Sequence, residues 1–68
     1  MSELNLKPNL HDPDGFYAHL LAVHDGLTKP ESDALNARLI LILANHLGDE
    51  QVLAQALQAA AQTARAQA

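Results

Sequence analysis

Hydrophobic residues recur at steps of three and four positions in three segments, and each segment begins with a helix-capping signal. In the first segment Asp12 is a strong N-cap, Pro13 suits the first helical position and Gly26 suits a left-handed C-cap. The pattern therefore predicts a helix over 12–26. The apolar residues that recur at these steps in and directly after the helix are Phe16, Leu20, Val23 and Leu27.

The second segment opens with a capping box, in which the side chains of Thr28 and Glu31 each accept from the other residue's backbone N–H. The segment stops at Gly48, so a helix is predicted over 28–47. The unbroken apolar run Leu39–Leu43 would also suit a buried strand. The cap and the glycine nevertheless bracket a span of helical length, which favours the helix.

The third segment starts at Asp49 as N-cap, with Glu50 near the positive end of the helix dipole. A helix is predicted over 49–64, with a frayed tail over 65–68. Alanine and glutamine dominate this segment, and both favour helix. Its apolar face consists of Val52, Leu53, Ala56, Leu57, Ala60 and Ala64.

Residues 1–11 precede the helices and are predicted to form an extended arm. Leu4, Leu6 and Leu10 are separated by polar residues, and Pro8 prevents a helix through the middle. Two interpretations are open. The segment is a partly ordered tail, or its leucines lie in a groove of this chain or of a partner.

The fold class predicted is all-α, a small three-helix module with an extended N-terminal arm in one domain, 1–68. The second helix is apolar around roughly three quarters of its circumference when residues are placed at about 100° steps. Two helices of the same chain cover about half of such a helix, so we expect a homo-oligomer, with a dimer favoured. The predicted interface residues are Asn36, Arg38, Leu39, Ile40, Leu43, Asn45, His46 and Leu47.

Three polar residues of the second helix each have two interpretations. Asn36 is solvated at the rim, or it fixes helix register in an oligomer as single buried asparagines do in coiled coils. His46 packs while its ring bonds a backbone carbonyl or a carboxylate such as Asp49 or Glu50, or it makes a pH-sensitive contact at an interface. Arg38 pairs with an acidic neighbour, or it anchors a partner.

Composition and charge exclude several classes of partner. The net charge is −4 and the four basic residues are scattered, which argues against nucleic acid and anionic membranes. The longest apolar run, Leu39–Ala44, is too short to span a membrane, and Met1–Glu3 does not begin a signal peptide. The chain has no cysteine, which excludes disulfides and fits a cytoplasmic protein.

No catalytic, cofactor-binding or metal-binding residues are predicted. The four histidines, His11, His19, His24 and His46, show no i, i+4 pair on one helix. The stretch Asp12–Gly15 looks superficially like a calcium loop but lacks the distal glutamate, so we interpret it as helix capping. An enzyme is therefore not expected.

Four stretches of the chain carry a distinctive combination of residues: Asn9–Tyr17, Gly26–Thr28, Leu35–Leu39 and Leu43–Asp49. The chain resembles, over about residues 4–57, a bacterial family of short proteins catalogued as domain of unknown function 2783. Its Ala- and Gln-rich tail after Leu57 departs from the compact family endings. Members often occur beside flavoprotein hydroxylases of aromatic-compound breakdown, so the resemblance implies an oxidoreductase as partner.

The function expected is that of a non-catalytic helical protein-interaction or accessory module, working as a homodimer. The alternative is a small-molecule binding protein for an aromatic ligand. Its pocket would lie between helices and be lined by Phe16, Tyr17, Leu20 and His46. The aromatic side chains there are the only two in the chain.

Overall fold

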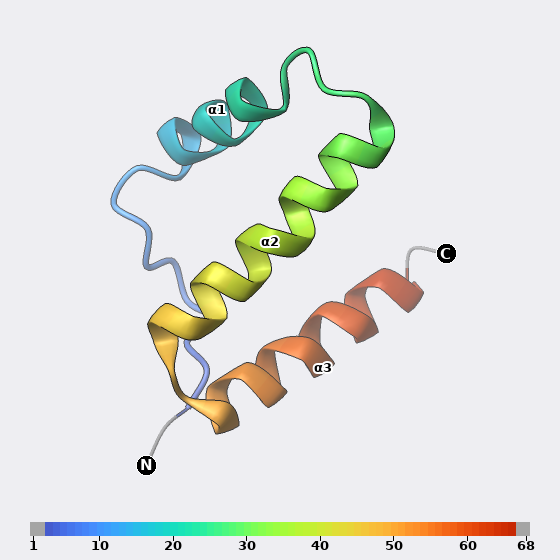
Figure 1. Ribbon diagram of the computed structural model, residues 1–68. Coiled ribbons are helices and arrows are strands. Elements are labelled where there is room, and N and C mark those ends of the chain that lie inside the picture. Colours follow the sequence, from blue (N-terminus) through green and yellow to red (C-terminus); the bar gives the residue numbers. More distant parts are fainter. Residues whose placement is uncertain (1–2, 67–68) are drawn as a thin grey trace.

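The computed structural model describes residues 3–66, which form three α-helices and no strand in that range. The helices are α1 (Pro13–His24), α2 (Lys29–Leu47) and α3 (Glu50–Ala66). They follow one another in a zigzag with short connections (Figure 1). The all-helical prediction is thus confirmed, and the alternative of a strand within the second segment is wrong.

The start of α1 is fixed by Asp12, whose carboxylate accepts from the Gly15 N–H at 3.0 Å. The helix ends at His24, two residues before the predicted end. Asp25 is the C-cap in extended conformation, and Gly26 follows it with φ +81°. The left-handed conformation of Gly26 was therefore predicted correctly, but the C-cap is Asp25 and not Gly26.

Both ends of α2 follow from residue-specific capping. The Thr28 N–H donates to Glu31 Oε1 at 2.9 Å, and the Glu31 N–H donates to Thr28 Oγ1 at 3.3 Å. Gly48 ends the helix with φ +69°, and its N–H donates to the Ala44 carbonyl at 2.9 Å. The capping box and the glycine stop are both confirmed.

The start of α3 uses Asp49, whose carboxylate accepts from the Val52 N–H at 3.1 Å. The helix continues to Ala66, so the prediction of a tail frayed from residue 65 is wrong for 65 and 66. Alanine and glutamine make up most of residues 54–66 and favour helix up to that point. The rest of the predicted tail, 67–68, lies outside the described residues.

The described residues before α1, 3–12, run back along the molecule toward the start of α3 (Figure 1). The Leu4 N–H donates to Gln55 Oε1 at 2.8 Å, and the Leu4 side chain is half-buried. Leu6 and Leu10 are exposed. One of the three leucines of this segment therefore meets the body of the chain, and residues 1–2 lie outside the described range.

The three helices do not enclose a core. No side chain of residues 3–66 is buried, and no two helices pack along their lengths there. The radius of gyration is 13.7 Å, whereas a compact domain of this length has about 11 Å. A single chain is therefore an open arrangement of well-capped helices.

Candidate interaction surface

One stripe of α2 is both apolar and uncovered. Asn36, Ile40, Leu43 and Leu47 are separated by four, three and four residues, so they lie within about 60° of one another on the helix. We call these four residues the α2 seam. Ile40 is 61% exposed, Leu43 48% and Leu47 58%, and Asn36 is also exposed. About half or more of each apolar side chain in the seam is therefore left exposed by the chain.

The neighbouring stripe of α2 is partly covered. Leu35 and Leu39 are half-buried, while Ile42 and His46 continue the same stripe and are exposed. Leu39, one of the predicted interface residues, is thus partly occupied by contacts inside the chain. Of the two interpretations of His46, the one in which its ring packs within the chain is not supported, because the side chain is exposed.

Arg38 and Asn45 lie on the side of α2 opposite the seam and are exposed. At about 100° per residue, both positions are more than 150° from the seam's centre. Arg38 has no ion pair among residues 3–66, where Lys29 and Asp33 form an exposed ion pair at 3.0 Å. The eight predicted interface residues are therefore not all on one face of α2.

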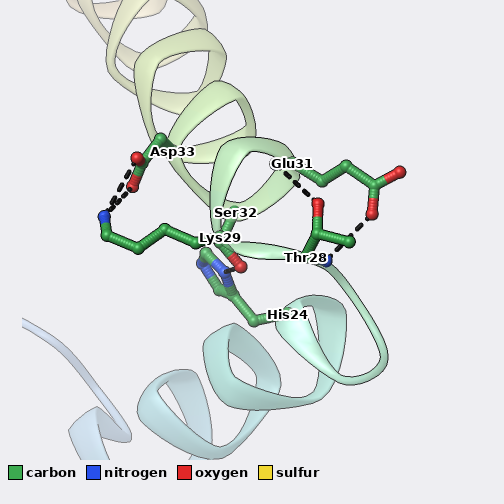
Figure 2. Close-up of polar contacts among 6 residues, drawn as sticks. All are labelled: His24, Thr28, Lys29, Glu31, Ser32 and Asp33. Atoms are coloured by element: carbon green, nitrogen blue, oxygen red, sulfur yellow. Dashed lines mark hydrogen bonds and ion pairs between the residues drawn. The ribbon is translucent and has the colours of Figure 1, made fainter.

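A polar cluster that the sequence did not reveal joins α1 to α2. The ring of His24 points toward the Ser32 hydroxyl (Figure 2), with Nδ1 3.0 Å from Ser32 Oγ. His24 Nε2 lies 3.0 Å from Asn36 Oδ1. Because Asn36 Oδ1 only accepts, Nε2 carries a proton, and in the neutral ring Nδ1 accepts from the Ser32 hydroxyl. Each side chain thereby satisfies the next.

Two features of the sequence could have suggested this cluster. His24 is in the last turn of α1, and Ser32 and Asn36 are four residues apart on one side of α2. What the sequence lacked was the angle between the helices, which brings them together. Hydrogen bonds that connect a serine hydroxyl, a histidine ring and a side-chain amide also occur in sites of nucleophilic catalysis. The hydrogen bonds here join two helices, so we interpret the cluster as a positioning contact for α1 and Asn36.

The residues of the predicted ligand pocket lie on two helices. Phe16 and Tyr17 are exposed on α1, Leu20 is half-buried, and His46 is exposed on α2. An open surface hollow of about 440 Å³ lies instead along the N-terminal segment, lined by Asn5, Leu6, Lys7, Pro8, Asn9, Leu10 and Pro13. None of the four predicted pocket residues lines it.

Residues 3–66 contain no group of three or more His, Asp or Glu side chains placed to hold a metal ion. No helix within that range is long and apolar enough to cross a membrane.

These features define a class of small all-helical proteins with capped helices and an apolar surface left uncovered by the chain itself. The chain belongs to the family described as protein of unknown function DUF2783, whose model matches residues 4–62. Comparison with curated proteins gave no match, and neither did comparison with solved structures. The resemblance noted in the sequence is thereby confirmed, and it extends into the alanine-rich part of α3.

Proposed function

We propose that this protein is a non-catalytic interaction module, a small accessory subunit that binds protein through the apolar faces of its helices. The observation that supports this is the absence of any buried side chain over residues 3–66, where thirteen large hydrophobic side chains are exposed. Exposed apolar surface costs about 25 cal/mol per Å² in water. Contact with protein removes that cost.

The helix that best fits a binding role is α2, which holds five of those thirteen side chains: Ile40, Leu41, Ile42, Leu43 and Leu47. They lie on more than one side of the helix. A partner that covers the α2 seam leaves Leu41 and Ile42 open, so α2 can serve two contacts at once.

The partner that we propose is an oxidoreductase of aromatic-compound breakdown, as the family resemblance implies. The location that we propose is the cytoplasm. Co-purification with a tagged chain from its native cell tests the binding role. The wild type should retain a second protein in stoichiometric amount, and tagging that protein should recover this chain in return. Recovery of the chain alone, as a 7.3 kDa monomer, would contradict the proposal.

Two variants make that test specific. Ile42→Asp puts a charge on exposed apolar surface and should abolish retention of the second protein, since a buried unpaired charge is costly. Gln58→Asp introduces the same residue at an exposed polar position of α3 and should retain it. Equal retention by both variants would show that the apolar face of α2 does not bind that protein.

The ligand-binding alternative has its own test, a thermal-shift screen with aromatic acids and flavins. An interaction module is expected to show no change in Tm with these compounds. A ligand that binds the folded state raises Tm in a concentration-dependent way. A saturable rise abolished by Phe16→Ala would favour the ligand-binding protein instead.

A further inference from the structure

We propose that the α2 seam is covered by the α2 seam of a second copy of this chain, packed antiparallel about a twofold axis. This inference rests on the proposed function, in which the exposed apolar surface binds protein. It identifies a second copy of this chain as one protein that covers that surface. Three independent features support it: the area that the chain exposes, the spacing of the seam, and the hydrogen bond of Asn36.

The exposed area fits an obligate dimer. The chain exposes 6174 Å², about 2,000 Å² more than the roughly 4,200 Å² expected for a compact monomer of 7.3 kDa. Two copies together have an excess of about 4,000 Å², which is within the range of about 2,000–5,000 Å² that obligate homodimers bury. The seam is too short to account for all of it, so α1 and α3 contribute further contacts on either side.

The spacing of the seam reads the same in both directions. Steps of four, three and four residues are symmetric about a point midway between Leu41 and Ile42. A twofold axis at that point sets Ile40 against Leu43 of the second copy, and Asn36 against Leu47 of the second copy. This is the a-to-d pairing of an antiparallel coiled coil. Ala37 and Ala44 flank the seam and let the helices approach closely.

A parallel arrangement is disfavoured by charge. Continuing the seam by one heptad from Ile40 toward the N-terminus reaches Asp33, which in a parallel pair would face Asp33 of the second copy. In the antiparallel pair Asp33 instead extends beyond the end of the other α2, which stops at Leu47. The same two carboxylates are then far apart.

Asn36 is prepared for partial burial at the end of the seam. Its Oδ1 accepts from His24 Nε2 at 3.0 Å within the same chain, so covering it leaves no unpaired acceptor. Its amide nitrogen lies at the edge of the pairing, where water remains. The cluster that joins α1 to α2 therefore also satisfies Asn36 Oδ1 before Leu47 of the second copy covers it.

Engineered cysteines test the register. The chain has no cysteine, so introduced thiols are the only ones present. A mixture of Ile40→Cys and Leu43→Cys chains should form a disulfide-linked dimer faster than either variant alone, because Ile40 faces Leu43 of the second copy and neither position faces itself. Faster linking of Ile40→Cys to itself would indicate a parallel pair. Faster linking of Leu41→Cys would show that the seam is not the interface.

Charged substitutions test the seam without introduced cysteines. Leu43→Asp should raise the dimer dissociation constant by on the order of 30-fold or more, as loss of an interface hot spot does. Leu41→Asp is the matched control, because Leu41 is 69% exposed and about 160° away around the helix. An equal effect of both variants would overturn the inference.

The state of the wild-type chain separates this inference from the proposed function. A helical dimer supports both. A monomer that is poorly helical and melts without cooperativity contradicts the homodimer. The proposed function would still hold, because binding of a different protein could order the chain. A monomer that is fully helical and unfolds cooperatively contradicts both, because such a chain needs no partner.

Discussion

His24 Nε2 lies 3.0 Å from Asn36 Oδ1, and this hydrogen bond connects the last turn of α1 to the second turn of α2. The connection between these helices is only Asp25–Thr28. Apolar contacts between α1 and α2 are few. The hydrogen bonds of His24 to Asn36 and to Ser32 are therefore the specific contacts that set the angle between the two helices.

Replacement of His24 should destabilise the fold measurably. His24→Ala removes two hydrogen bonds, each with a net contribution of about 0.5–1.5 kcal/mol, so we expect a loss of about 1–3 kcal/mol in the free energy of unfolding. Urea unfolding at a fixed protein concentration measures it. His19→Ala is the control, because His19 is exposed on the same helix. Similar losses in both variants would show that the cluster does not hold α1.

The capping box at α2 gives a second prediction. Thr28→Ala should cost about 1 kcal/mol of stability, because the Glu31 N–H loses its acceptor at the helix start. Thr63→Ala is the matched substitution. The Thr63 hydroxyl donates to the Ala59 carbonyl, which is already part of the α3 backbone ladder, so little change is expected. Thermal unfolding of the two variants side by side provides the comparison.

The turn between α2 and α3 gives a third prediction. Gly48 has φ +69°, a left-handed conformation that costs an L-residue roughly 1–2 kcal/mol. Gly48→Ala should therefore lower stability by about 1 kcal/mol, and Gly48→Asn by less, because asparagine tolerates this region. Equal stability of the alanine variant and the wild type would mean that the turn can relax without its left-handed residue.

Much of the local structure could be predicted from the sequence because capping depends on nearest neighbours. Asp12, Thr28 with Glu31, Gly48 and Asp49 each act through a partner within four residues, and all were identified. The errors were confined to one or two residues at helix C-termini. There the sequence offers weaker signals, such as alanine and glutamine continuing to favour helix past residue 64.

The exposed surface was harder to predict. Helical periodicity gives the angular position of each side chain around the helix, but it does not tell which side chains the rest of the chain covers. The wide apolar arc of α2 correctly indicated a helix in need of partners. It could not reveal that Leu39 is half-buried within the chain while Ile40, Leu43 and Leu47 are exposed. The role of His24 depends on an angle between helices, which no local pattern encodes.

One chain cannot complete its own core, and we propose that association with a second copy does so. The most direct test follows molar mass by light scattering and helix content by circular dichroism over the same dilution series. We expect a mass near twice 7.3 kDa when concentrated, with mass and helix content falling together on dilution. A mass of 7.3 kDa at every concentration, with undiminished helix content and a Tm independent of concentration, would contradict the claim.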